Sequence, residues 1–305
     1  MKRLFIYIIG IMLVQGMKAQ TTYQASDSVK ICQLLRQANR ETSVLWLARQ
    51  FLNIPYVAHT LEVNDDERLV VNTRQLDCTT FIETVTALKL CAQQGKRSFA
   101  DYLAILRQLR YRQGRMAGYP SRLHYFTDWI RDKSEMQLVT DIQQPNPPFS
   151  AVQTVNVNYM STHPTAYKAL KANPALVPEI RASEVSLNGM KVSYIPKRSL
   201  RNNALLRKVI KDGDILAITC NKKGLDIAHL GFAVWRNDGL HLLNASMLHK
   251  KVVVEPMTLY QYMQKHKTFT GIRVLRINSL NSKLRKYGIT RFYELWQQVL
   301  EAGLC

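Results

Sequence analysis

The sequence predicts an α+β protein, with helices in the first half of the chain and an antiparallel sheet in the second. Residues 26–53 and 78–91 place apolar side chains three and four positions apart, as a helix with one buried face requires. From residue 192 onward, short β-branched or apolar runs alternate with turn residues, and Asp238-Gly239 is typical of a tight turn between paired strands. Separation of the two patterns along one chain is typical of the α+β class.

The helical half contains three predicted segments. The first ends near Pro55, because proline interrupts a helix, and residues 56–76 are predicted to be extended or looped. The second begins at Asp77 or Cys78, since apolar residues follow at helical spacing. Ser98 is a suitable N-cap for the third segment, "FADYLAILRQLRYR".

The middle of the chain is less regular. Glycines and a proline in residues 111–130 predict turns before a short aromatic helix, and residues around 131–190 are interpreted as inserted loops, partly helical near their end. The strands follow: "VSYIP", "GDILAITC", "AHLGFAVWR", "LHLLNAS", "KVVVEPM" and "TGIRVLRI". Residues 20–305 are interpreted as a single domain.

The first 19 residues have the pattern of a secretory signal peptide. Lys2-Arg3 precede an apolar run, which is followed by small residues up to a predicted cleavage site after Ala19. The apolar run is short for a membrane span, and no later segment resembles one. We therefore expect a periplasmic or secreted protein with no membrane span.

The chain is strongly basic. Removal of residues 1–19 takes away three basic residues and lowers the formal net charge from +20 to +17. A cationic exported protein suits an anionic polymer or surface, although the charge could equally serve solubility. No dense Lys/Arg tract with interleaved aromatic residues is present, so a nucleic-acid partner is not expected.

The cysteines indicate a reactive thiol. Five are present, an odd number, so at least one remains unpaired in an oxidising compartment. No C-x-x-C or H-E-x-x-H pattern supports a metal site, and no cofactor is expected.

Cys78 has the position expected of a nucleophile. At a helix amino end, unpaired amide hydrogens and the helix dipole favour the thiolate. The other interpretation is that Cys78 is a small buried apolar residue that begins a core helix.

A nucleophilic thiol also needs a base, and the base needs an orienting group. His229 opens the strand "HLGFAVW", from which a side chain can project toward a packed helix. The next strand offers His241 or Asn244 as the orienting residue. Strand alternation puts these two on opposite faces, so only one of them can serve.

These residues carry a family resemblance. "LDCTTFIETV" followed by "AHLGFAVWRNDGLHLLNAS" resembles the NlpC-type papain-like peptidoglycan hydrolases. "PYVAHTLE", "LDCTTFIET", "RYRQG" and "YPSRLHYFTDWI" resemble, more specifically, the N-acetylmuramoyl-L-alanine amidase-like branch of that superfamily. The resemblance extends from about Pro55 to about Ser246. It implies a papain-like fold, with the nucleophile helix packed on an antiparallel sheet.

The resemblance also implies roles for the residues. Cys78 would be the nucleophile, His229 the general base and then acid, and Asn244, which is often histidine in relatives, the preferred orienting residue over His241. The substrate and oxyanion residues would be Tyr56, Asp77, Ser121, Arg122 and His124. Among them, the Tyr56 hydroxyl would stabilise the oxyanion, and Arg122 would bind a carboxylate of the stem peptide.

The function implied is hydrolysis of peptidoglycan or muropeptides at the N-acetylmuramoyl-L-alanine bond by an exported cysteine amidase. One alternative keeps the same Cys/His site and cuts between D-glutamate and the diamino acid of the peptide. A second is a glycan-binding protein without catalysis. Residues 20–305 would then form a single catalytic domain.

Overall fold

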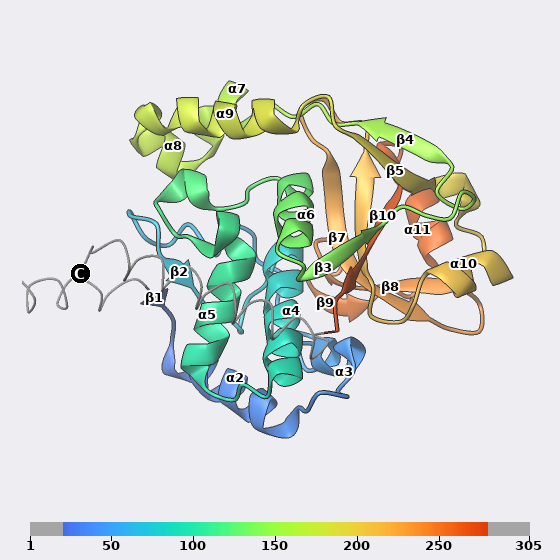
Figure 1. The fold of residues 1–305 in the computed structure, drawn as a ribbon, viewed down its shortest axis with the longest axis horizontal. Helices are drawn as coiled ribbons and strands as arrows, with labels where there is room; N and C mark the ends of the chain where they lie inside the picture. Colours follow the sequence, from blue (N-terminus) through green and yellow to red (C-terminus); the bar gives the residue numbers. More distant parts are fainter. Residues whose placement is uncertain (1–20, 280–305) are drawn as a thin grey trace, which may run out of the picture.

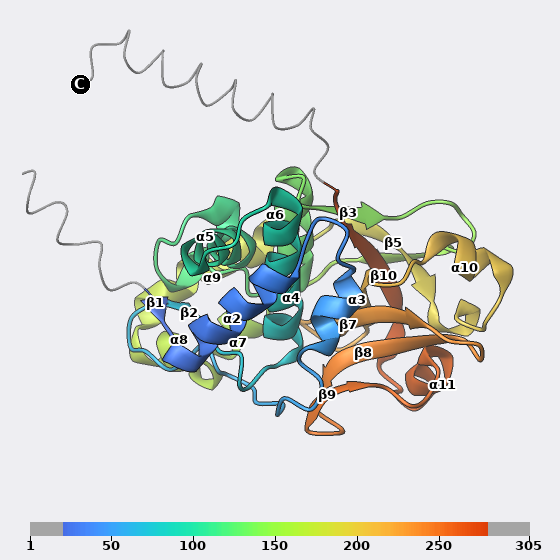
Figure 2. The ribbon, with the colours of Figure 1, turned by 90° about the horizontal axis from the view of Figure 1, so that it is seen from below.

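The computed structural model describes residues 21–279, and within them the α+β prediction is confirmed. Helices α2 to α6 gather against one face of the sheet, and α10 and α11 lie on the opposite side (Figures 1 and 2). The predicted signal peptide, residues 1–19, and Cys305 lie outside the described residues. The other four cysteines are free thiols.

The helices follow the predicted order, except that residues 26–53 form two helices where one pattern was seen. The bounds are α2 Ala25–Gln37, α3 Val44–Arg49, α4 Cys78–Gln94, α5 Phe99–Arg110, α6 Phe126–Glu135, α7 Tyr159–Thr162, α8 Lys168–Ala172, α9 Val177–Leu187, α10 Ala204–Val209 and α11 Leu259–Gln264. Ser98 caps α5 as predicted, because its side chain accepts from the backbone amide of Asp101.

Eight strands form the main sheet, in the order β4-β5-β10-β6-β7-β8-β9, with β3 pairing to β10. Every described pairing within it is antiparallel. The bounds are β3 Val139–Ile142, β4 Ala151–Thr154, β5 Lys191–Pro196, β6 Ile215–Cys220, β7 Ile227–Trp235, β8 Leu240–Ser246, β9 Lys251–Val254 and β10 Phe269–Ile277. Two short strands, β1 Thr21–Thr22 and β2 Leu69–Val70, pair in parallel apart from the sheet.

The sheet is covered on both faces, which explains why β6 is buried along its whole length. Alternate residues of this strand enter different cores: Ile215 and Ala217 pack with α2–α6, whereas Leu216 and Ile218 pack with α10 and α11. Burial on both faces explains why the sequence of β6 is a continuous apolar run rather than an alternation of apolar and polar residues.

Helix α4 lies at the centre of the helical layer and fixes the position of Cys78. Thirteen of its residues are buried, and the ring of Phe81 meets that of Phe232 on β7 edge-on at 5.5 Å. Glu83 on its second turn pairs with buried Arg110 at 2.7 Å. A helix held on all sides cannot shift easily, so its amino end has a fixed place relative to β7.

The segment 131–190 differs from the prediction of inserted loops. It supplies β3 and β4 to the sheet, and α7 to α9 pack around a small core that they share with Tyr119 and Tyr125. Prolines and scattered apolar residues hid these elements, because each is short and buries only a few side chains. Pro178 does not break α9, since it lies in the first turn, where no amide hydrogen bond is lost.

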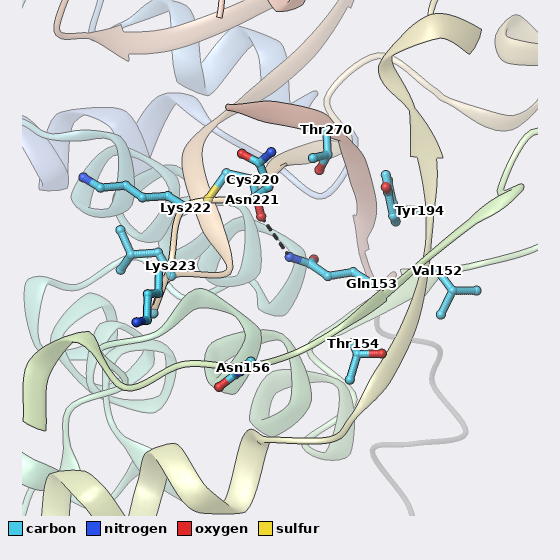
Figure 3. A pocket seen from close by; sticks show the side chains of 12 residues that line it. Val152, Gln153, Thr154, Asn156, Tyr194, Cys220, Asn221, Lys222, Lys223 and Thr270 are labelled. Carbon is cyan, nitrogen blue, oxygen red and sulfur yellow. Dashed lines mark hydrogen bonds between the residues drawn. The ribbon is translucent and has the colours of Figure 1, made fainter. Parts of the chain in front are cut away.

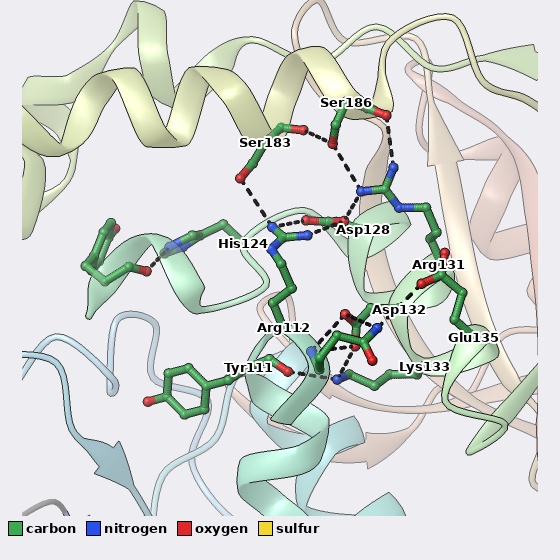
Figure 4. A network of polar contacts seen from close by, with 12 residues as sticks. Tyr111, Arg112, His124, Asp128, Arg131, Asp132, Lys133, Glu135, Ser183 and Ser186 are labelled. Atoms are coloured by element: carbon green, nitrogen blue, oxygen red, sulfur yellow. Dashed lines mark hydrogen bonds and ion pairs between the residues drawn. The ribbon is translucent and has the colours of Figure 1, made fainter. Parts of the chain in front are cut away.

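A polar network attaches α9 to α6 (Figure 4). Arg112 binds Asp128 at 2.7 Å and the hydroxyl of Ser183 at 3.2 Å, while Arg131 binds Asp128 at 2.8 Å and Ser186 at 3.1 Å. Asp128 is buried, so its two guanidinium partners compensate its charge. The α7–α9 cluster is thereby held beside the helical layer.

Candidate active site

Cys78 is the first residue of α4, as the sequence predicts. Asp77 is the N-cap, and its side chain accepts from the backbone amide of Thr80 at 2.8 Å. The Thr80 hydroxyl in turn accepts from the Asp77 amide at 2.9 Å, which completes a capping box. This reciprocal pair sets the first turn and therefore the place of the thiol.

His229 lies near the start of β7 and lines the same cavity as Cys78, which has a volume of about 170 Å³. Both residues remain partly exposed toward it. The next residue, Leu230, donates its backbone amide to the Cys78 sulfur, so strand and helix end are in direct contact. At Gly231 a Cβ atom would come within 2.6 Å of the Leu242 side chain, which explains the glycine of His-x-Gly.

Asn244 is the residue that orients His229. Its Oδ1 lies 2.9 Å from His229 Nε2, and its amide nitrogen donates to the Leu242 carbonyl at 3.2 Å. Because Oδ1 can only accept, His229 Nε2 carries the proton and Nδ1 is left as a free acceptor. His241 is engaged elsewhere, by the Glu255 carbonyl and Asp238.

The electrostatics differ from the expected thiolate. Burial, together with the negative charge of Asp77, raises the pKa of Cys78 to about 12, against opposing hydrogen bonds from Thr79 and Leu230. Burial also lowers the pKa of His229, with the Asn244 hydrogen bond opposing. Near neutral pH the resting pair is therefore a neutral thiol and a neutral imidazole. The helix dipole alone does not offset the loss of solvation.

Tyr56 lies close to the thiol from a separate segment. Its backbone amide donates to the Lys250 carbonyl at 2.9 Å, and its side chain packs on the same core as Cys78. Burial and the charges of Cys78 and Asp77 raise the pKa of Tyr56 to about 12. The hydroxyl is therefore protonated and can donate a hydrogen bond.

Arg122 does not have the place that the sequence interpretation gave it. Its guanidinium is buried, pairs with Glu62 at 2.5 Å and lies 3.6 Å from Glu67, and it covers the Tyr119 ring at 4.8 Å. Two carboxylates already compensate its charge. We therefore do not assign it to a carboxylate of the substrate.

Ser121 and His124, which lie on either side of Arg122 in the sequence, differ in their position relative to the cavity of Cys78. Ser121 donates to the Gly118 carbonyl at 2.6 Å and accepts from the Ala117 amide at 2.9 Å, so it closes a local turn. His124 lines the cavity of Cys78, and its Nε2 donates to the Tyr119 carbonyl at 2.9 Å. Burial, reinforced by nearby Arg122, lowers the pKa of His124 to about 3, so this imidazole is neutral.

Several residues of the cavity were not singled out in the sequence. They come from α6, from the α7–α8 region and from the β6–β7 loop: Phe126, Met160, Tyr167, Leu225 and Asp226. Asp226 is buried, and it accepts from the Thr127 backbone amide at 2.9 Å. The aspartate ahead of "AHLG" was a usable signal for this link between the β6–β7 loop and α6, whereas the apolar residues carried none.

Comparison with known proteins places this chain in a family. The model of the AmiA-like family, described as N-acetylmuramoyl-L-alanine amidase-like, matches residues 46–272. The chain belongs to the N-acetylmuramoyl-L-alanine amidase-like family. The match contains Tyr56, Cys78, His229 and Asn244. A search of curated proteins finds no significant match.

Solved structures agree with the family. An N-acetylmuramoyl-L-alanine amidase from Bacteroides uniformis is similar at 39% identity, with 81% of this chain and 99% of that chain covered and a TM-score of 0.73. A Bacteroides fragilis protein provisionally described as a xylanase shares 41% identity, over 76% of this chain and 99% of its own, with a TM-score of 0.71. A Legionella pneumophila protein at 22% identity covers 83% and 93% of the two chains at a TM-score of 0.63, and shares the fold.

Residues 21–279 of this amidase-like protein contain neither an evident metal-binding cluster nor a membrane-spanning helix. No group of three or more His, Cys, Asp or Glu side chains is arranged to hold a metal ion there. In the same part of the chain, no helix has both the length and the apolar character that crossing a bilayer requires.

Proposed function

We propose that the protein is an exported cysteine amidase that hydrolyses the bond between N-acetylmuramic acid and L-alanine in peptidoglycan or its muropeptides. The observation that carries the proposal is the hydrogen bond of 2.9 Å from His229 to Asn244, which leaves Nδ1 free in the cavity of Cys78. The family supports an amidase-like peptidoglycan hydrolase, and the helix–sheet arrangement supports a papain-like fold of the NlpC type.

The reaction begins from the neutral pair. As the Cys78 sulfur attacks the lactyl carbonyl, His229 Nδ1 removes the thiol proton, so a free thiolate need not form in the buried site. The imidazolium that forms is stabilised by Asn244 Oδ1. In this proposal the Cys78 backbone amide and the hydroxyl of Tyr56, which lies near the thiol, donate to the developing oxyanion.

Collapse of the tetrahedral intermediate breaks the amide bond. His229 passes its proton to the departing nitrogen of L-alanine, and a thioester to Cys78 remains. A water molecule then attacks the thioester with His229 again as base, which releases the lactyl carboxylate and regenerates the thiol. Protons and electrons balance without a cofactor.

Product analysis tests which bond is cut. Purified muropeptides of defined structure are incubated with the protein and the products identified by mass spectrometry. We expect the free sugar and an intact peptide that begins with L-alanine. A dipeptide left on the sugar would instead assign the D-glutamyl-diamino acid endopeptidase activity, and unchanged substrate at high enzyme concentration would support a glycan-binding protein.

The pH dependence follows from the two pKa shifts. Because the pKa of His229 is lowered from 6.5, we expect kcat/KM to stay high at pH 6.5 and to fall only at lower pH, when the base becomes protonated. With the pKa of Cys78 raised to about 12, no loss is expected between pH 7 and roughly 9.

A control variant tests whether the fall of kcat/KM at low pH is due to protonation of His229. His163→Gln changes an exposed histidine that does not line the cavity, and its profile should overlay that of the wild type. A bell-shaped profile with an alkaline limb near pH 8 would contradict the neutral pair and indicate a preformed thiolate–imidazolium pair.

A further inference from the structure

A second cavity, of about 320 Å³, is formed by β4, β5 and the loop between β6 and β7 (Figure 3). Its lining is rich in polar side chains, among them Gln153, Asn156, Asn221, Lys222 and Lys223. No role in the proposed hydrolysis involves any of these residues. The cavity is accessible from solvent, and its polar and basic lining suits a charged ligand.

This cavity adjoins the one that contains Cys78. Leu225 lines both, and the next residue, Asp226, lines the active-site cavity. Gln153 spans the same loop, since its Nε2 donates to the carbonyls of Cys220 and Asp226 at 3.3 Å. The wall between the two cavities is therefore one short piece of chain, which continues directly into the strand of His229.

A contact between Lys222 and Tyr159 also connects the second cavity to the active-site cavity. The Lys222 ammonium lies 6.0 Å from the centre of the Tyr159 ring, and the residue after Tyr159, Met160, lines the active-site cavity. Lys222 therefore lies beside the segment that supplies Met160 to the active-site cavity.

The chemistry of the lining indicates what would bind. Lys222 and Lys223 are exposed, and within residues 21–279 neither forms an ion pair. The Oε1 atom of Gln153 is buried and accepts no hydrogen bond in the described structure. Two ammonium groups without an ion-pair partner suit a carboxylate, and the unused acceptor of Gln153 suits an amide N–H; the end of a peptide carries both groups.

We propose that this cavity binds the C-terminal carboxylate of the stem peptide while the amide of its first residue lies at Cys78. The inference rests on the proposed function and adds a preference to it. An extended peptide of four residues spans up to about 14 Å, and the two cavities adjoin at Leu225, so a tetrapeptide stem is the longer ligand that this arrangement suits. Lys222 and Lys223 are then specificity-determining residues.

A kinetic experiment compares two substrates that differ only at the far end. Muropeptides with a tetrapeptide stem are prepared with a free or an amidated C-terminal carboxylate, and kcat/KM is measured for the wild type and for the Lys222→Gln/Lys223→Gln double variant. We expect the wild type to prefer the free carboxylate by about tenfold and the double variant to lose that preference.

The matched control is Lys208→Gln, which removes an exposed lysine from α10, outside the cavity. It should retain the wild-type preference. Equal preference in the wild type and the double variant would overturn the proposal, and so would a wild type that treats both substrates alike.

A binding measurement separates this inference from the proposed function. Calorimetry with the Cys78→Ala variant uses the free tetrapeptide of L-alanine, D-glutamate, a diamino acid and D-alanine, with its amidated form as comparison. We expect the free acid to bind more tightly than the amidated peptide, and we expect this difference to disappear in the variant that also carries Lys222→Gln and Lys223→Gln. That result would support binding of the carboxylate in the second cavity even if no hydrolysis is ever detected. Equal affinity for the two peptides contradicts it.

Discussion

Replacing Cys78 with alanine is expected to reduce muropeptide hydrolysis by roughly 10⁴-fold or more, because no other group in the cavity can form the thioester. The fold should survive, since the capping box of α4 is made by Asp77 and Thr80 and not by the thiol. The measurement is the rate of peptide release from a defined muropeptide, together with a thermal unfolding curve for each protein.

Cys32→Ala is the matched control, because Cys32 is another partly exposed free cysteine, on α2. It should keep full activity. Activity retained by the Cys78→Ala variant would remove the proposed mechanism. Slow alkylation of Cys78 by iodoacetamide, in contrast, would not, because a thiol whose pKa is raised by burial is expected to react slowly until a substrate engages it.

Replacing His229 with glutamine is expected to lower kcat by about 10²- to 10⁴-fold, the usual contribution of a positioned acid–base group. Glutamine can keep a hydrogen bond to Asn244 but cannot take the thiol proton. The same turnover assay measures the loss, and the residual activity should no longer fall at acidic pH. This second readout distinguishes a missing base from a disturbed strand.

The companion variant Asn244→Ala tests the orienting role. It should lower kcat less than His229→Gln, because the imidazole remains but loses its fixed tautomer. His163→Gln, an exposed substitution, should leave kcat unchanged. A full rate in the His229→Gln protein would show that another group acts as base, and His124, which lines the same cavity, would be the first to examine.

Local sequence pattern was sufficient for the elements that hold Cys78, His229 and Asn244, the proposed reacting groups. The start of α4 could be predicted, because an N-cap followed by apolar residues at helical spacing is decided by neighbouring residues. Strand alternation separated Asn244 from His241 on β8, and the observed hydrogen bond to His229 agrees with the preference for Asn244.

The electrostatics could not be predicted in the same way. The expected thiolate rested on the helix dipole, which is local, whereas the raised pKa of Cys78 comes from burial by distant segments. Arg122 was assigned to a substrate for the same reason, since nothing in its own segment reveals Glu62 and Glu67. Both differences arise from long-range packing.

The short elements between residues 131 and 190 illustrate a third limit. Strand β4 has only four residues and pairs with β5 about forty positions later in the chain, so its own sequence contains little of the information that stabilises it. Helices α7 and α8 depend likewise on a shared core with Tyr125, outside their segment. Elements of this kind form by tertiary contact rather than by local propensity.

The capping box and the His229–Asn244 pair belong to segments about 150 residues apart, which only the completed helix–sheet interface brings together. An unfolded chain therefore lacks the proposed hydrolytic centre, even though it already contains the cysteine. The proposed catalytic competence therefore depends on the contact between β7 and the amino end of α4, where Leu230 meets Cys78.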